Sequence, residues 1–345
     1  MKDSRTEQIV RRPTMSDVAA LARVSSKTVS RVINDEPRVS PVVQQRVREA
    51  IERLSYRPDP RAGSLRRSGQ RSETIGLAIN NVDNPFSAAV HRAIEDAAVA
   101  RGVAVLASST DDVPVREPRV VEGLLRRRVD GLIAAPVSRD QSYLRTEQKY
   151  GTPMVFIDRE PVGVDADAVV SDHTGGARMA ASHLIEVGHR RIAFLGDLTT
   201  LQSTQQRLTG FREALGYAGI PTTAARVVTE LHSADVIENA VRALMNGHDR
   251  PTALFSAQNS ITIGTIRALR ALDMHNDVAL IGFDDILLAD LLVPAITVIA
   301  QDSQRIGSLA AERLFARLDG DRSATATHVV PVRLVTRGSG EIPPA

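Results

Sequence analysis

The stretch MSDVAALARVSSKTVSRVIND, residues 15–35, predicts two short helices joined by a tight turn. Residues 17–22 make a helix with one apolar face, and a brief interruption follows. Ser25 is placed to cap a second helix over 26–33, because a short hydroxyl side chain is favoured at that position. Val29 and its apolar neighbours share one face of this second helix. Two short helices across such a turn are typical of a helix-turn-helix.

A third helix is predicted after this pair. Ser40 would cap it, Pro41 suits its first turn, and Val43, Val47, Ile51 and Leu54 recur on one face. This apolar stripe closes a three-helix core. The second helix meanwhile exposes hydrogen-bonding side chains, which suit a helix lying in the major groove of DNA. An ordinary polar face on a small helical bundle would have the same composition.

Charge is distributed unevenly along the 345 residues. Residues 1–71 contain 16 Lys and Arg and 8 Asp and Glu, a net charge of +8. The rest of the chain contains 27 basic and 33 acidic residues, a net charge of −6. A basic segment on an acidic body indicates a polyanionic partner for the segment, although a solvated, disordered basic tail would show the same bias.

Composition excludes several functional classes. The chain contains no Cys, which excludes disulfides, thiolate catalysis and metal sites built on Cys. No apolar stretch reaches the roughly 18–20 residues that span a bilayer, and the first residues lack the apolar core of a signal peptide. We therefore expect a cytoplasmic protein, associated with the nucleoid, that has no membrane partner.

Residues 14–67 resemble the DNA-binding headpiece and hinge of the lactose/galactose repressor family. The resemblance lies in the opening stretch and in LSYRPDPRAGSLRR, residues 54–67. In that family the second segment forms a hinge helix on DNA, and a Leu wedges between base pairs in the minor groove. Leu65 occupies the matching position, and Ala62 lies on the same segment as a further DNA-binding residue. Such a wedge kinks the duplex and brings more phosphates into contact with the protein.

The resemblance assigns roles to the second helix. We expect Ser26, Lys27 and Arg31 to contact base edges, and Thr28, Ser30 and Asn34 to contact phosphates. Two departures from the family carry a cost. Arg23 stands where the family often has Gly, which costs about 1 kcal/mol if its φ is positive. Arg61 and Gly63 replace the more usual hinge residues, and Gly lowers helix propensity by about 1 kcal/mol, so the hinge helix should be harder to form.

From Thr74 onward, apolar runs alternate with amphipathic stretches. This alternation predicts parallel sheets with right-handed crossovers. There are too many units for one sheet, so the expected fold is α/β, with two doubly wound subdomains and a ligand cleft at the carboxyl ends of their strands. The predicted strands are 75–79, 103–107, 131–135, 155–158, 192–195, 253–256 and 278–281, and the predicted helices are 86–100, 120–127, 175–187, 205–217, 235–245 and 261–272.

This body resembles the effector-binding core of the same family, which has a fold like that of periplasmic binding proteins. The matching stretches include VDNPF at 82–86, EVGHRRIAFLGD at 186–197 and VALIGFDDILLAD at 278–290. With the headpiece, the resemblance covers nearly the whole chain. The implied domains are a disordered basic tail (1–13), the helix-turn-helix (14–58), the hinge (59–72) and the effector-binding and dimerisation core (73–345), with subdomains of about 73–170 plus 302–330 and about 171–301 plus 331–345.

The resemblance also implies a set of effector-binding residues, namely Asn84, Phe86, Asp158, Arg159, His173, Arg207, Asn259, Asp284 and Gln301. A guanidinium fork such as that of Arg207 suits a carboxylate, a phosphate or vicinal hydroxyls. Asn259 stands where the family often has an acidic residue, and His173 where Asn is common. The absence of a carboxylate at position 259 makes a plain neutral sugar less suitable as the effector. Asn259 would instead tolerate an anionic effector. The expected ligand class is a sugar or a sugar derivative, without a cofactor.

Other functions fit parts of the sequence. An enzyme is one, but G-x-G-x-x-G, P-loop and H-E-x-x-H motifs are all missing, so we expect no catalytic residues. His183 and His189 need not share a face across Gly188, so no metal site is expected. A periplasmic solute-binding protein would match the body but not the basic head. The sequence also fits a regulator whose core responds to a protein partner rather than to a small molecule.

The sequence therefore predicts a homodimeric, DNA-binding transcriptional repressor. It would bind a near-palindromic operator with an affinity controlled by a small-molecule effector in the cleft of the core. The C-terminal VTRGSGEIPPA lacks the apolar heptads with which some relatives form tetramers, so a dimer is expected.

Overall fold

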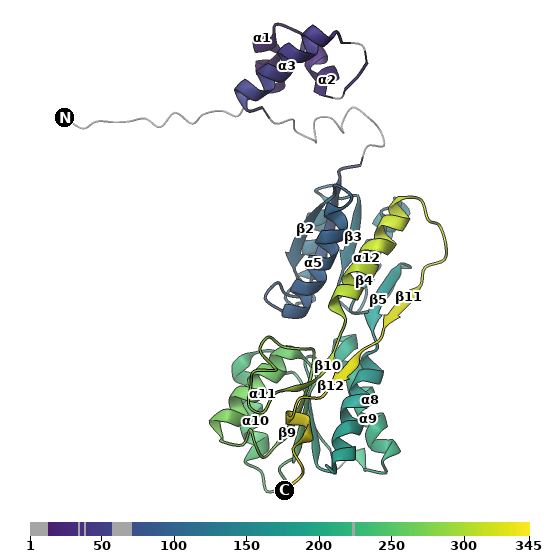
Figure 1. Ribbon diagram of the computed structural model, residues 1–345. Helices are drawn as coiled ribbons and strands as arrows, with labels where there is room; N and C mark the ends of the chain where they lie inside the picture. The colour runs from purple at the N-terminus through teal and green to yellow at the C-terminus, as the bar shows by residue number, and fades with distance from the viewer. Residues whose placement is uncertain (1–12, 34, 38, 57–70, 223–224) are drawn as a thin grey trace, which may run out of the picture. The chain divides into compact units, whose positions relative to one another are not determined.

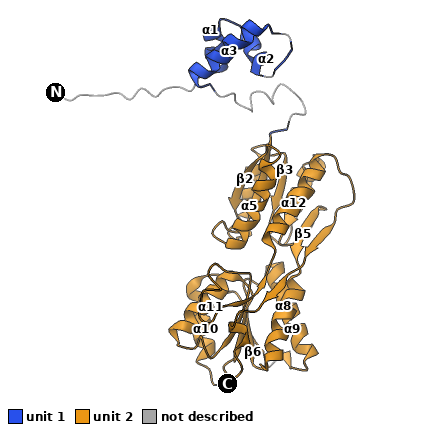
Figure 2. Ribbon diagram, viewed as in Figure 1, with its two compact units in different colours: residues 1–72 blue, residues 73–345 orange. Residues whose placement is uncertain are grey.

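The computed structural model describes residues 13–33, 35–37, 39–56, 71–222 and 225–345. The chain divides into two compact units, residues 1–72 and residues 73–345, shown in blue and orange in Figure 2. Each unit is described by itself. Asn34, Ala62 and Leu65 lie outside the described residues, so their roles at DNA stay predictions.

The first unit is built from three helices: α1 (Met15–Ala22), α2 (Ser26–Ile33) and α3 (Pro41–Leu54) (Figure 1). The first helix begins two residues earlier than predicted, because Thr14 and Asp17 form a capping box. The Thr14 backbone N–H donates to Asp17 Oδ2 at 2.7 Å, and the Asp17 N–H donates to Thr14 Oγ1 at 3.4 Å. The core between the helices is formed by Val18, Ala19, Ala22, Val29, Val32, Val47, Ala50 and Tyr56.

The turn between α1 and α2 requires an unusual backbone conformation. Arg23 ends α1 with φ 54° and ψ 49°, the left-handed region in which Gly is favoured. The strain expected for an Arg at this position is therefore present. Ser25 caps α2 as predicted, since its Oγ accepts the Thr28 N–H at 3.1 Å. Ser40 precedes α3, but its side chain makes no capping hydrogen bond, which corrects that expectation.

The second unit contains two six-stranded sheets, each with helices on both faces (Figure 1). The first sheet is wholly parallel, in the order β11–β5–β4–β3–β1–β2. Its strands are β1 (Thr74–Ile79), β2 (Ala104–Ser109), β3 (Gly131–Ala134), β4 (Met154–Ile157), β5 (Asp167–Ser171) and β11 (Thr327–Val330). One face is covered by α5 (Pro85–Val99) and α12 (Ser303–Leu318). The other face is covered by α6 (Glu117–Leu125) and the short helix η1 (Ser142–Leu144). Helix α7 (Arg145–Lys149) follows η1 along the chain.

The second sheet has the order β12–β10–β9–β8–β6–β7. Its strands are β6 (Ile192–Leu195), β7 (Arg226–Val228), β8 (Ala253–Ser256), β9 (Ala279–Phe283), β10 (Thr297–Ala300) and β12 (Arg333–Val335). One face is covered by α8 (His173–Val187) and α9 (Gln202–Tyr217), the other by α10 (Ala234–Met245) and α11 (Asn259–Ala271), and η3 (Ser339–Glu341) follows β12. None of the helices in the described ranges combines the length and apolar character needed to cross a membrane.

Every helix and strand predicted for this unit is present, with ends displaced by at most three residues. The expectation of parallel sheets fails at one edge, because β12 pairs antiparallel with β10. Apolar periodicity did not predict the strands β5, β7, β10, β11 and β12, nor the helices η1, α7, α12 and η3.

The chain passes between the two sheets three times, after β5, after β10 and between β11 and β12. Consequently neither sheet is formed by one continuous segment. The crossings fall at residues 172, 301–302 and 331–332, and the loops at the carboxyl ends of the strands of both sheets meet beside them. This arrangement brings polar residues from distant parts of the sequence to one place.

A glycine sets the distance between α8 and α9. A Cβ atom built on Gly210 would lie 2.0 Å from the carbonyl oxygen of Thr174, at the start of α8. Backbone atoms of one helix therefore occupy the space that a side chain on the other would need. Gly216, later in α9, has nothing within 4 Å of its hypothetical Cβ.

These two glycines give a matched test of the helix contact. We expect Gly210→Ala to destabilise residues 73–345 by about 3 kcal/mol or more, because the two helices must separate. Gly216→Ala should be neutral or stabilise by up to about 1 kcal/mol, since Ala is the better helix former. Urea unfolding of both variants measures the difference. Equal stabilities would show that α8 and α9 do not pack through Gly210.

Candidate nucleic-acid interface and ligand site

Helix α2 presents the side chains that were predicted to contact DNA. Ser26 and Lys27 are exposed, while Thr28, Ser30 and Arg31 are partly exposed. Val29 and Val32 of the same helix are buried in the three-helix core, which fixes the polar face outward. The helix therefore offers hydroxyl, ammonium and guanidinium groups on one surface.

Thr28 and Arg31 have partners within the unit. The Oγ1 of Thr28 is 2.9 Å from the Oγ of Ser25, so this hydroxyl belongs to the helix cap. Arg31 Nε lies 3.5 Å from Glu36 Oε2, and the two side chains are 35% and 45% exposed. An ion pair this exposed contributes little free energy. Arg31 can therefore leave it for another hydrogen-bond acceptor.

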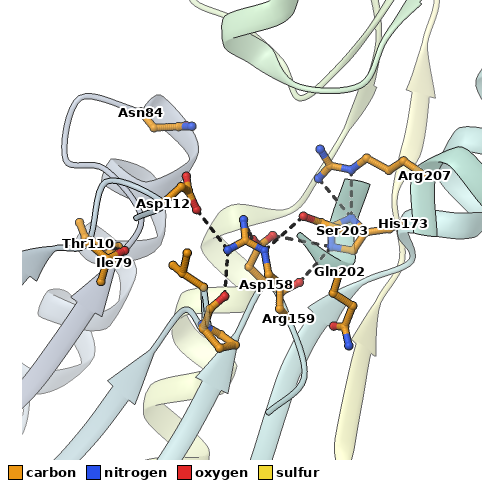
Figure 3. A network of polar contacts seen from close by, with 12 residues as sticks. Ile79, Asn84, Thr110, Asp112, Asp158, Arg159, His173, Gln202, Ser203 and Arg207 are labelled. Atoms are coloured by element: carbon orange, nitrogen blue, oxygen red, sulfur yellow. Dashed lines mark hydrogen bonds and ion pairs between the residues drawn. The ribbon is translucent and has the colours of Figure 1, made fainter. Parts of the chain in front are cut away.

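In the second unit, polar residues from both sheets meet at the carboxyl ends of the strands (Figure 3). On the side of the first sheet, Asp158 and Arg159 follow β4, and Asn84 caps the start of α5. The second sheet and its helices bring His173, Arg207, Asn259 and Asp284, and Gln301 lies where the chain leaves β10. The structure thus brings these predicted ligand residues together. Phe86, whose N–H donates to Asn84 Oδ1 at 3.0 Å, lies beside them and packs in part against the core of the first sheet.

Arg159 connects the two sheets. Its Nη1 donates to the carbonyl oxygen of Pro136 at 2.9 Å and to Asp112 Oδ1 at 3.2 Å. Its Nε donates to the Oγ of Ser203, at the start of α9, at 3.3 Å (Figure 3). Arg159 is only 5% exposed, so its charge is balanced by these contacts rather than by bulk water.

His173 links the cluster around Asp158 to Arg207 (Figure 3). Its Nε2 lies 3.0 Å from the backbone oxygen of Asp158, and its Nδ1 lies 3.3 Å from Arg207 Nε and 3.2 Å from Arg207 Nη2. Because Arg207 can only donate, Nδ1 is the acceptor and Nε2 carries the proton. Burial, and next the charge of Arg207, lower the pKa of His173 to about 4. The ring is therefore neutral at pH 7, and its 3.7 Å approach to the Asp158 carboxylate is not an ion pair.

The guanidinium group of Arg207 lies over an aromatic side chain of the second sheet. Its guanidinium carbon is 3.8 Å from the centroid of Phe283, and its Nη1 donates to the carbonyl oxygen of Ala257 at 2.6 Å. Burial lowers the pKa of Arg207, while the nearby carboxylate of Asp284 opposes that change. An aromatic face and a carbonyl hold the fork in one plane, which pre-organises it for a ligand.

Two amides form a direct contact across the cleft. Asn259 Nδ2 donates to Asn84 Oδ1 at 2.7 Å, and Asn84 Nδ2 donates back to Asn259 Oδ1 at 3.3 Å. Asn84 belongs to the loop after β1, and Asn259 begins α11 beside the second sheet. The residue that departs from the family pattern therefore has a complementary partner in this chain.

The carboxyl groups of the cluster differ in their pKa. Burial tends to raise the pKa of Asp158, but the charges of Arg159 and Arg207 and a hydrogen bond from Asn80 bring it below its usual value. Burial raises the pKa of Asp112, Asp197 and Asp284. Gln301 Nε2 donates a short hydrogen bond to Asp284 Oδ1. Four carboxyl groups therefore surround two guanidinium groups.

Two buried polar atoms near the cluster lack a partner. Asn80 Oδ1, just after β1, and Gln301 Oε1, just after β10, accept no hydrogen bond from any described residue. Buried acceptors of this kind normally have a donor, and hydroxyl groups of a ligand would supply one.

Four members of this site were not predicted from the sequence: Asn80, Asp112, Asp197 and Ser203. Asn80, Asp112 and Asp197 lie within three residues of the ends of β1, β2 and β6, so a polar residue in the loop after a strand was the signal that would have found them. Ser203 carries no such signal, because it begins a helix that reaches the cleft only in the folded chain.

The two histidines considered for a metal site hold the C-terminal segment instead. His183 Nε2 lies 2.7 Å from Glu341 Oε1, and His189 lies 2.9 Å from Thr252 Oγ1 and 2.8 Å from the carbonyl oxygen of Ile342. Among the residues that the structure describes, no group of three or more His, Cys, Asp and Glu side chains is arranged to hold a metal ion.

The low pKa of His173 predicts a pH-dependent stability. Between pH 8 and 5 the unfolded chain takes up a proton at this residue and the folded chain does not. Falling pH should therefore destabilise the wild type relative to His173→Asn by about 2 kcal/mol. Urea unfolding of both proteins at the two pH values measures this difference. The exposed His248, changed to Asn, serves as the control, and a variant at 173 that tracks the wild type would contradict the buried neutral ring.

Comparison with known proteins agrees with this architecture. Residues 14–59 match the model of bacterial regulatory proteins of the lacI family, and residues 181–340 match a periplasmic binding protein-like domain. The ribose operon repressor of Escherichia coli (strain K12) is 34% identical over 308 residues, which cover 88% of this chain and 93% of the relative.

Two solved structures extend the comparison. A lac repressor dimer bound to operator and an anti-inducer is 27% identical with a TM-score of 0.81, covering 96% of this chain and 99% of that one. A lacI-family regulator from Enterococcus faecium with bound ribose is 25% identical with a TM-score of 0.72, covering 78% and 99%. These relatives are transcriptional regulators rather than enzymes. With both of its units matched and a relative aligned over most of its length, the chain belongs to the lacI family of bacterial regulatory proteins.

Proposed function

We propose that this protein is a cytoplasmic, dimeric transcriptional repressor whose affinity for a near-palindromic operator is set by a neutral sugar bound in the cleft of residues 73–345. The observation that carries the proposal is the buried polar cluster between the two sheets, in a chain that also bears a helix-turn-helix. Residues 14–58 would bind DNA, residues 59–72 would form the hinge, and the core would bind the sugar and dimerise.

Base recognition would lie with Lys27, Arg31 and Ser26 on α2. Thr28, Ser30 and Asn34 would contact phosphates, and Ala62 and Leu65 would enter the minor groove. Arg31 would exchange its exposed contact with Glu36 for a base edge, where a bidentate guanidinium pair discriminates by about 1–3 kcal/mol.

A second copy of this chain is the proposed partner of an exposed apolar segment. Leu287 is 83% exposed, Val293 73%, Leu291 70% and Leu288 55%. A cluster of large apolar side chains this exposed is typical of an interaction surface. The solved lac repressor relative is a dimer on its operator, which supports the same assembly here.

The charges of the cleft favour a neutral polyhydroxylated ligand. Asp112, Asp158, Asp197 and Asp284 outnumber Arg159 and Arg207, so a phosphate would meet an excess of carboxylates. Hydroxyl groups would instead donate to these acids and accept from the guanidinium forks. The relative with bound ribose supports this class. The amide of Asn259 is hydrogen-bonded to Asn84, so position 259 does not form a separate binding site for an anion.

Control of DNA binding would pass through the crossings between the sheets. A sugar that contacts residues of both sheets changes the angle at which they meet, and with it the positions of the two hinges in the dimer. Such control requires a different affinity of the sugar for the two arrangements.

The base contact of Arg31 can be tested with operator DNA selected from the source genome. Arg31→Ala should weaken binding by about 1–3 kcal/mol and relax the preference at a single position of each half-site. Anisotropy titrations with operators altered one position at a time measure this. Arg53→Ala, on α3, is the control and should leave base preference unchanged. A uniform loss over all sequences would make Arg31 a phosphate contact.

The dimer can be tested by light scattering of the full chain. The expected mass is twice the 37.3 kDa of one chain. Leu287→Asp combined with Leu291→Asp should give monomers, because burying a carboxylate at an interface is unfavourable. Tyr217→Asp, at another exposed position, should stay dimeric. A tetramer, or a dimer that survives the double change, would overturn the proposed surface.

The ligand class can be tested by calorimetric titration with neutral sugars and their phosphate esters. We expect a neutral sugar to bind at least tenfold more tightly than its phosphate. Arg207→Lys should weaken that binding at least tenfold, because Lys has no fork, whereas Arg212→Lys on the exposed face of the same helix should not. Tighter binding of the phosphate ester would restore the anionic effector.

A further inference from the structure

We propose that a basic edge of the second unit, formed by Arg126, Arg127 and Arg128, contacts the phosphates of the DNA that the first unit binds. The inference rests on the DNA binding proposed above. It adds a set of contacts that are independent of sequence and made by the core rather than by the headpiece.

The basic edge lies beside the point where the chain enters the core. The Asp130 N–H donates to the carbonyl oxygen of Thr74, the first residue of β1, at 2.7 Å, and the Ala104 N–H donates to that of Glu73 at 2.8 Å. The loop after α6 therefore adjoins the first residues of the second unit. DNA held by the first unit is tethered to this end of the core by residues 57–72.

The three guanidinium groups are available to a partner. Arg126 is paired with Glu122 at 2.7 Å, but the Arg126 side chain is 74% exposed, so the pair is weak. Arg127 donates to the carbonyl oxygen of Gly123 at 2.6 Å. Within the described part of the chain, neither Arg127 nor Arg128 forms an ion pair with a carboxylate.

Two acidic groups in the loop after α12 already have partners. Asp319 pairs with Arg101 at 2.8 Å, and Asp321 pairs with Arg313 at 3.0 Å. These two carboxylates are therefore not free to neutralise the basic edge. The positive charge of the basic edge contrasts with the core as a whole, which carries a net charge of −6 over residues 72–345.

The backbone conformation at Arg128 is one that favours Gly. Its φ is 56°, in the left-handed region where Gly is tolerated best. An Arg here bears conformational strain, and within the described residues its side chain forms no ion pair. Several other residues share this backbone conformation, so it is the exposed charge of Arg128 that supports a role in binding.

The charge of the segment that joins the two units also favours DNA as the partner. Residues 57–72 contain five Arg and one Asp, a net charge of +4. This charge has the same sign as that of the basic edge. A duplex, with one negative charge per about 1.7 Å of helix axis, attracts both.

The test measures how the affinity of the full chain for DNA depends on salt. The variant Arg126→Gln, Arg127→Gln, Arg128→Gln is compared with the wild type on operator DNA and on a random-sequence duplex of equal length. We expect the slope of log affinity against log salt concentration to fall in magnitude by about 1–3 for each chain bound, since each phosphate contact contributes about 0.9. The affinity for both duplexes should fall by a similar factor, because phosphates carry no sequence information.

A matched variant and a single substitution separate the outcomes. Arg212→Gln, Arg226→Gln, Arg250→Gln removes the same charge from exposed positions on the second sheet and its helices, and its slope should equal that of the wild type. Arg128→Gly removes one charge at a position where Gly fits the backbone, so its slope should fall by about 1 without a lower melting temperature.

A change in slope below about 0.5 for the triple variant at the basic edge, or an equal change in its control, would overturn the proposal while leaving the repressor function intact. A wild-type chain that binds neither duplex would overturn both.

Discussion

Two guanidinium groups buried between the sheets, those of Arg159 and Arg207, constrain the rest of the core. Removing a charge from water costs several kcal/mol unless hydrogen bonds and opposite charges replace the hydration. Here the replacement comes from both sheets: Asp112 and the Pro136 carbonyl from one side, Ser203, His173 and the Ala257 carbonyl from the other. Arg159 thus joins residues on both sides of the cleft, and Arg207 is connected to the Asp158 side through His173.

The same network explains why His173 differs from a solvent-exposed histidine. Arg207 requires an acceptor on one ring nitrogen, and the Asp158 carbonyl oxygen accepts from the other. Both requirements are met only by the neutral ring, in agreement with its low pKa. Across the cleft, Asn84 and Asn259 add a neutral contact. The cleft therefore combines a buried charged centre with an uncharged amide pair.

Much of this architecture was readable in the sequence because its signals are local. Apolar periodicity located the three headpiece helices and the predicted elements of both sheets, and the strain at Arg23 followed from one departure at a turn. Elements with weaker periodicity, such as the edge strands β7 and β12, were missed, and the antiparallel direction of β12 is set by the crossing from β11 rather than by its own residues. The partners of Arg159 could not be predicted either, since Asp112 and Ser203 are 47 and 44 residues away and meet it only through tertiary packing.

The three crossings have a consequence for synthesis of the chain on the ribosome. Helix α12 and strand β11, which complete the first sheet, lie within residues 303–330, so that sheet stays open along the edge of β5 until nearly the whole protein has been made. The headpiece, in contrast, is closed by contacts within residues 14–56 and can fold as soon as it emerges. The helix-turn-helix unit is thus complete long before the first sheet of the core, so the two units fold at different stages of synthesis.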